Sequence, residues 1–123
     1  MSNPRIAILG AAGYTGAELI DIITLHPSVH LVGLFRGARS GDASCTTAVA
    51  DVAPRLAGRT DLPILPFTPG ALLDLDPDAV FLATPHEASH EIAPVLLERG
   101  IVPIDISGAF RLSDPAAHEA AYG

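Results

Sequence analysis

The sequence predicts an α/β fold, a doubly wound and mainly parallel sheet with helices on both faces. Short apolar runs bounded by Gly or Pro are typical of strands buried on both faces. These runs alternate with stretches of helical spacing, and such alternation implies parallel strands joined by right-handed crossovers. A chain of 123 residues, 49% of them hydrophobic, fits one globular domain over residues 1–123.

The first strand and helix are the clearest elements. The run from Arg5 to Gly10 is short, apolar and ended by glycine, which predicts a buried strand. After the turn, Leu19, Ile20 and Ile23 recur at helical spacing, and the helix is expected to end before Pro27.

The middle of the chain is less regular. Residues 29–35 predict a second strand, and residues 36–61 mix Gly, Ser, Thr, Ala and Pro without a period. We expect an extended loop there, with a short helix or strand inside it as an open alternative. Residues 62–67 are compatible with a short third strand, and residues 69–77 with a short helix that has Pro near its start.

The last part of the chain again alternates. Residues 78–84 predict a buried strand, residues 87–100 a helix closed by Gly100, and residues 101–107 another strand. Pro94 within that helix either kinks it or marks its true first turn.

Composition narrows the classes of partner. The formal net charge is -7, and all seven basic residues are arginines scattered singly along the chain. Without a basic stripe we expect no nucleic-acid partner and no membrane partner, but a small molecule whose anionic groups are held locally. The lone Cys45 excludes an intramolecular disulfide, and no signal or membrane-spanning run is present. These features predict a cytoplasmic protein.

A glycine-rich turn follows the first strand. Gly10, Gly13 and Gly16 have the spacing G-x-x-G-x-x-G and open the first helix. Small residues there let backbone amides at a helix N-terminus approach a pyrophosphate, as in a Rossmann-like dinucleotide site. The alternative is a tight turn with close packing. The strand-turn-helix context favours dinucleotide binding.

The end of the second strand indicates which dinucleotide. An NAD site usually has Asp or Glu there to bind the ribose 2′-hydroxyl. This sequence has Arg36, Arg39 and Ser40, with no carboxylate before Asp42. Arginine suits a 2′-phosphate, so NADP is the predicted cofactor. The alternative is that these arginines are solvated loop charges.

His86, Glu87 and His90 form the pattern His-Glu-x-x-His, which can bind zinc on a helix. The two histidines lie about 40° apart around a helix and could both reach a ligand. The zinc-protease extension needs a glycine and a third histidine, where this sequence has Ala93 and Leu96. Zinc hydrolysis is therefore disfavoured, and we expect no metal.

The same stretch follows a predicted strand. Ligands of open α/β sheets bind beyond the carboxyl ends of the strands, so Thr84, Pro85 and His86 are expected to line the cofactor cleft near its nicotinamide half. A histidine that faces water at a helix start remains the alternative for His86.

Four stretches resemble one enzyme family. They read "GAAGYTGAELI", "HPSVHLVGL", "VFLATPHEASHEIAPVLLERG" and "DISGAFRLSDPAAHEAAYG". In this order they resemble the N-terminal part of N-acetyl-gamma-glutamyl-phosphate reductase, and the last stretch is the most specific. The resemblance spans nearly the whole chain and is poorest over residues 36–61.

The resemblance implies a reaction and a set of residues. The family reduces N-acetyl-glutamyl 5-phosphate with NADPH, through a cysteine thioester, to the 5-semialdehyde and phosphate in arginine biosynthesis. Arg111 would then face the substrate's anionic groups together with His86, an ion pair of Arg111 with Asp105 or Asp114 being the alternative. The implied cofactor contacts are Gly10, Ala12, Gly13, Tyr14, Thr15 and Gly16 at the pyrophosphate, Arg36, Arg39 and Ser40 at the 2′-phosphate, and Thr84, Pro85, Ser107 and Gly108 at the nicotinamide.

The resemblance also has gaps. The family's nucleophile lies in a Pro-Gly-Cys context downstream of Tyr122 and Gly123, and its histidine base and substrate domain have no counterpart among these residues. Cys45 lies in a different context and is interpreted as an inert thiol, so no catalytic residue is assigned. We expect cofactor binding without turnover, and self-association through apolar surface. A relative of aspartate-semialdehyde dehydrogenase and a non-catalytic nucleotide-binding module remain alternatives.

Overall fold

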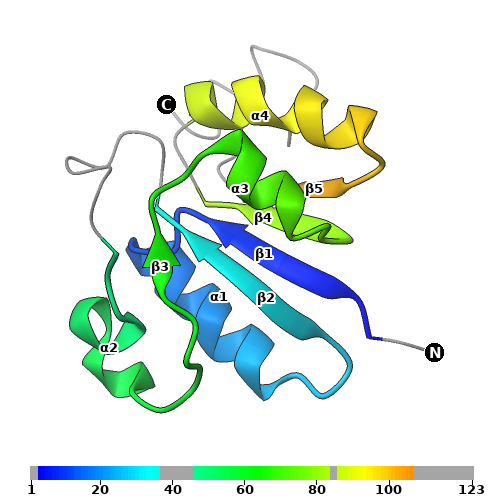
Figure 1. Cartoon of the computed structure of the whole chain (residues 1–123). Coiled ribbons are helices and arrows are strands. Elements are labelled where there is room, and N and C mark those ends of the chain that lie inside the picture. The colour runs from blue at the N-terminus through cyan, green and yellow to red at the C-terminus, as the bar shows by residue number, and fades with distance from the viewer. Residues whose placement is uncertain (1–2, 37–45, 84–85, 107–123) are drawn as a thin grey trace, which may run out of the picture.

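A five-stranded sheet forms the centre of the molecule (Figure 1). The computed structural model describes residues 3–36, 46–83 and 86–106, with the backbone alone for residues 86–90. All the strand pairings in the sheet are parallel, in the order β3-β2-β1-β4-β5, which confirms the predicted doubly wound α/β class. The elements are β1 (Arg5–Leu9), α1 (Tyr14–Leu25), β2 (His30–Phe35), α2 (Val49–Val52), η1 (Pro54–Leu56), β3 (Ile64–Leu65), α3 (Pro69–Asp74), β4 (Ala79–Leu82), α4 (His86–Glu98) and β5 (Val102–Asp105).

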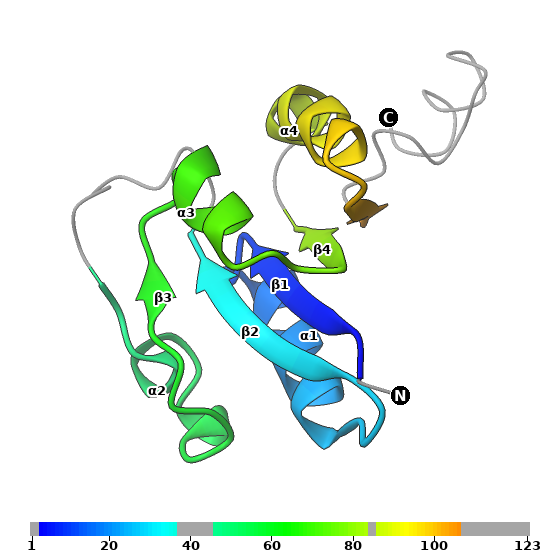
Figure 2. The same cartoon turned by 45° about the vertical axis from the view of Figure 1, so that its right-hand side comes forward.

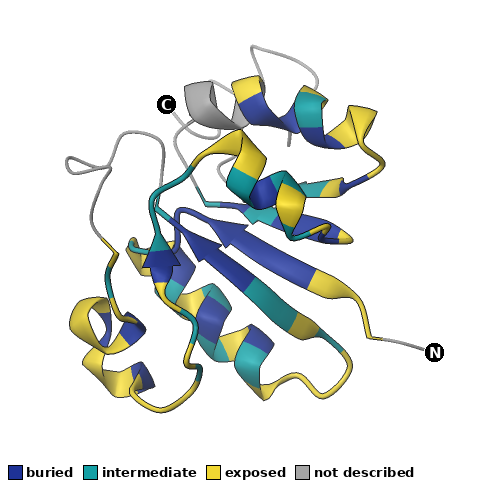
Figure 3. Ribbon diagram, viewed as in Figure 1, coloured by how far each residue is buried: buried dark blue, intermediate teal, exposed yellow. Residues whose placement is uncertain are grey.

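Helices cover both faces of the sheet (Figure 2). Alternate residues of β1 point to opposite faces, so that Ile8 packs with α1 and the α2 region, whereas Leu9 packs with α3 and α4. The strands in the middle of the sheet are the most deeply buried part of the chain, and exposed residues lie on the outer sides of the helices (Figure 3). Apolar burial on both faces is the main stabilising contribution to this fold.

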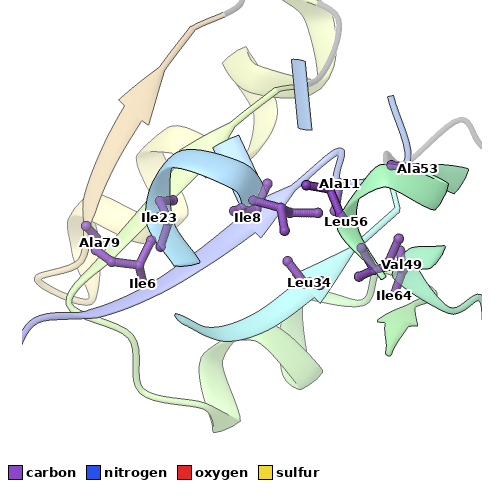
Figure 4. Packing of buried hydrophobic residues seen from close by; sticks show 11 residues of the cluster. Ile6, Ile8, Ala11, Ile23, Leu34, Val49, Ala53, Leu56, Ile64 and Ala79 are labelled. Atoms are coloured by element: carbon purple, nitrogen blue, oxygen red, sulfur yellow. The ribbon is translucent and has the colours of Figure 1, made fainter. Parts of the chain in front are cut away.

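The segment after β2 contributes to the core on the α1 side. Val49 of α2, Leu56 of η1 and Ala53 between the two helices pack against Leu34 and Ile64 of the sheet (Figure 4). Leu56 is fully buried. The part of the expected loop that the structure describes therefore contains the short helix that the sequence left open, and this helix is a structural element of the core.

The strands are shorter than their apolar runs. Only Ile64–Leu65 of the third run pairs with β2, because Pro63 and Pro66 on either side lack the amide that a sheet ladder needs. Pro94 lies inside α4, so the interpretation that it begins the helix is wrong. Gly100, with φ of 75°, ends the helix as predicted, and the amide of Ile101 donates to the carbonyl of Leu96.

The topology creates a switch point in the strand order, where ligands of such sheets bind. The strand order reverses at β1, whose neighbours are β2 and β4, and the chain leaves these two neighbours toward opposite faces of the sheet. Gly10 follows β1, Arg36 follows β2 and Ala83 follows β4, so all three lie at the carboxyl edge. This edge at the switch point is the expected ligand-binding position of a doubly wound fold. Across the described residues, no helix is both long and apolar enough to span a bilayer.

Candidate functional site

Two glycines of the turn after β1 are required by close packing. A Cβ atom on Gly10 would lie 2.4 Å from the carbonyl oxygen of Ala83, and the backbone of Gly10 has φ of +94°. A Cβ atom on Gly16 would lie 2.4 Å from the carbonyl oxygen of Gly10 and 2.6 Å from the Cα atom of Ala11. Close packing of strand and helix is thus a sufficient reason for glycine at these two positions.

Gly13 is different, because the fold does not require glycine there. It is the N-cap of α1 with φ of -90° and ψ of 177°, which other residues adopt readily. Of the described atoms, a Cβ atom on Gly13 would have only the carbonyl oxygen of Gly10 within 4 Å, at 3.8 Å. Gly13 and the next two residues are exposed. The missing side chain therefore leaves the end of the helix open to a ligand.

The backbone amides of the turn fall into two groups. The amides of Gly10 and Ala11 both donate to the carbonyl of Phe35 at 2.8 Å, and the amide of Gly13 donates to the carbonyl of Gly10 at 3.3 Å. These amides hold the turn in shape. A second group, which has no acceptor in the described part of the chain, comprises the amides of Ala12, Tyr14, Thr15 and Gly16.

The second group lies at the positive end of the helix dipole. No described side chain caps the N-terminus of α1, and the first turn of α1 contains no acidic residue that would neutralise the dipole. Tyr14 is 96% exposed at this end. Amides without acceptors in the described part of the chain, at a helix N-terminus where residues 13–15 are exposed, form a suitable binding site for a phosphate group.

Arg36 stands at the carboxyl end of β2. Its amide donates to the carbonyl of Leu65 at 2.9 Å, and its Nη2 donates to Oγ1 of Thr47. Its Nε is buried and has no hydrogen-bond partner within the described residues. Among the described residues no carboxylate forms a salt bridge with it. A half-buried guanidinium that has no counter-ion among the described residues, in a chain of net charge -7, is suited to an anionic ligand.

An ion-pair network connects α1 to η1 and to Arg59, which follows it. Asp21 accepts from Arg55 at 3.1 Å and from Arg59 at 2.7 Å, and Arg55 also donates to Glu18 at 2.5 Å. The hydrogen bond from Arg59 holds the pKa of Asp21 below its ordinary value of 3.8, against an opposing effect of burial. The network holds η1 and Arg59 against α1.

Several predicted site residues lie outside the described residues. The structure describes only the backbone of His86, which is the first residue of α4. Among the residues whose side chains are described, no group of three or more His, Cys, Asp or Glu could hold a metal. Ala93 and Leu96, at the positions where the zinc-protease pattern needs other residues, are buried in the core. The residues outside the description are Arg39, Ser40, Cys45, Thr84, Pro85, Ser107, Gly108 and Arg111.

One polar residue of the site was not indicated by the sequence. Thr47 contacts the guanidinium of Arg36 from 11 residues further along the chain. Its position in an aperiodic stretch gave no signal, because the contact depends on an isolated antiparallel bridge between Thr47 and Ile64.

The fold and the turn together define a class. A parallel sheet in this order, with a glycine turn between β1 and α1, is the arrangement of Rossmann-type domains. Comparison with known families agrees, since the family described as "Semialdehyde dehydrogenase, NAD binding domain" matches residues 5–123. The chain belongs to this family.

Individual relatives carry a more specific name. The N-acetyl-gamma-glutamyl-phosphate reductase of Salmonella typhi is 44% identical over 116 residues, which is 94% of this chain and 34% of the relative. The reductase of the same name from Escherichia coli K12 is 43% identical over the same shares, and that from Vibrio vulnificus is 40% identical over 97% of this chain and 35% of the relative. The chain thus spans about a third of the length of these relatives.

A solved structure supports the fold alone. Aspartate semialdehyde dehydrogenase with NADP from Candida albicans matches with a TM-score of 0.61 at 18% identity, over 91% of this chain and 32% of that chain. At 18% identity this similarity shows a shared fold and nothing further.

Proposed function

We propose that this chain forms the NADP-binding domain of an N-acetyl-gamma-glutamyl-phosphate reductase. The relatives of that name, 40 to 44% identical over at least 94% of the chain, support the identity of the enzyme. The observation that carries the cofactor assignment is the guanidinium of Arg36, which has a buried Nε without a partner and no carboxylate beside it in the described part of the chain.

The glycine turn would bind the pyrophosphate. The amides of Ala12, Tyr14, Thr15 and Gly16 are the donors for this role, since they have no acceptor among the described residues. Gly10 would contribute shape only, because the carbonyl of Phe35 already engages its amide. Gly13 would allow the close approach of the phosphate, because it leaves open space at the N-cap.

Arg36 would select NADP over NAD. A carboxylate at this position would bind the two ribose hydroxyls of NAD, and it would repel a 2′-phosphate. A guanidinium instead attracts the dianion and can bind it through two parallel N–H donors. Arg39 and Ser40 are proposed to complete this part of the site.

The bound cofactor supplies a hydride, and the substrate is proposed to be N-acetyl-glutamyl 5-phosphate, which is reduced to the 5-semialdehyde in arginine biosynthesis in the cytoplasm. Thr84, Pro85, Ser107 and Gly108 are proposed to lie at the nicotinamide. His86 and Arg111 are proposed to face the anionic groups of the substrate. These six assignments rest on the family resemblance of the motifs around them.

Titration of the chain with NADPH and with NADH, followed by cofactor fluorescence, tests the cofactor assignment. NADPH is expected to bind more tightly than NADH. Arg36→Ala is expected to weaken NADPH binding by about tenfold or more and to leave NADH binding nearly unchanged, because only the 2′-phosphate contact is lost. The matched control is Arg99→Ala, which removes the same charge from an exposed residue just beyond α4. Equal affinities for the two cofactors would refute the 2′-phosphate assignment.

A further inference from the structure

The contact between Arg36 and Thr47 joins two segments that are anchored to the same short strand. The amide of Arg36 donates to the carbonyl of Leu65 at 2.9 Å. On the other side of β3, Thr47 and Ile64 exchange backbone hydrogen bonds of 3.0 and 2.7 Å in an antiparallel bridge. Because Ile64 and Leu65 are consecutive, the backbones on either side of the guanidinium are held at a fixed separation.

The hydroxyl of Thr47 is the only hydrogen-bond acceptor that the described residues offer to the guanidinium of Arg36. It restrains the guanidinium through one nitrogen, Nη2, and it carries no charge. The other N–H donors of the guanidinium have no acceptor in the part of the chain that the structure describes, and Nε among them is buried. A neutral acceptor can therefore orient the arginine without competing for its charge, as a carboxylate would.

We propose that Thr47 is a positioning residue for NADP selectivity, which holds the guanidinium of Arg36 where a 2′-phosphate can bind it. This inference rests on the proposed function, because it assigns to Thr47 the orientation of the group that reads the 2′-phosphate. An arginine held in its binding conformation loses less side-chain freedom when the ligand binds. Thr47 thus affects the affinity for NADPH and leaves the affinity for NADH unchanged.

The test compares NADPH and NADH dissociation constants for the 123-residue chain and two Thr47 variants. Thr47→Val removes the hydroxyl and keeps the branched shape that suits the bridge with Ile64. It is expected to weaken NADPH binding by about five- to tenfold and to leave NADH binding within about twofold. Thr47→Ser keeps the hydroxyl and is expected to retain the preference for NADPH. Melting temperatures without ligand show whether each variant is folded, and Thr47→Ala replaces Thr47→Val if the latter is not.

The double variant with Arg36→Ala shows whether Thr47 acts through the arginine. In the Arg36→Ala background, Thr47→Val is expected to leave the ratio of the two dissociation constants unchanged. A further loss of selectivity in that background would overturn the positioning role, and so would an unchanged ratio for Thr47→Val alone. If the unsubstituted chain does not prefer NADPH, the proposed cofactor site itself fails, and this inference fails with it.

Discussion

Two alanine substitutions in the glycine turn should have different effects. Gly16→Ala should lower the stability of the fold, whereas Gly13→Ala should weaken cofactor binding. A Cβ atom on Gly16 would lie 2.4 and 2.6 Å from backbone atoms of the turn, which cannot yield as a flexible side chain does. Overpacking against rigid backbone falls in the upper part of the usual range, about 2–3 kcal/mol, and the gain from replacing glycine in a helix offsets about 1 kcal/mol of it. We expect a net loss of about 1–2 kcal/mol and a fall in Tm of roughly 5–10 °C.

Gly13→Ala should behave in the opposite way. Its Cβ atom would meet one atom of the described residues, at 3.8 Å, and its backbone conformation suits alanine, so the loss of stability should stay below about 1 kcal/mol. The same methyl group would occupy the space that a pyrophosphate needs, and NADPH binding is expected to fall by about tenfold or more. Thermal unfolding and NADPH titration of both variants provide the measurements. If Gly13→Ala binds NADPH as the unsubstituted chain does, the glycine turn does not contact the cofactor.

Two further predictions concern the segment after β2. Asp21→Asn should lower Tm at neutral pH, because the pKa of Asp21 is lowered in the folded state, mainly by its hydrogen bond with Arg59. A lowered pKa gives stability that is present above the ordinary value of 3.8 and is lost as the pH falls through the folded value. The Tm difference between the variant and the unsubstituted chain should therefore begin to shrink below about pH 4, and a difference that stays constant as the pH is lowered further would contradict the ion pair. Leu56→Ala should cost about 2–5 kcal/mol in urea unfolding, because Leu56 is fully buried in the core of the α1 face. A loss below about 1 kcal/mol would mean that the segment is not part of the core.

The fold could be predicted from the sequence because most elements carry local signals. The apolar run before Gly10, the helical spacing that ends before Pro27 and the glycine after α4 each reflect backbone chemistry within a few residues. The segment of α2 and η1 could not be assigned, since its order comes from distant contacts. Val49 and Leu56 pack against the sheet, and the two arginines of the ion-pair network reach back to α1.

Some residues of the candidate site could likewise be predicted from the sequence, and others could not. The glycine spacing and Arg36 were visible in the sequence, because each has a fixed relation to the end of a strand. The sequence did not show that close packing by itself requires glycine at positions 10 and 16. Gly13 is therefore the glycine of the turn whose presence is best explained by a ligand. Thr47 was missed, since its contact with Arg36 depends on a pairing across β3.

The most direct test of the dinucleotide site follows individual backbone amides by nitrogen-15 NMR while NADPH is added. Saturable shifts are expected for the four amides that lack acceptors among the described residues, and only small shifts for Gly58 and Gly70, which lie outside the turn. The proposed site would be contradicted if NADPH bound saturably while the resonances of the turn amides did not shift. It would also be contradicted if no resonance showed a saturable shift. The amides that should respond are those of Ala12, Tyr14, Thr15 and Gly16.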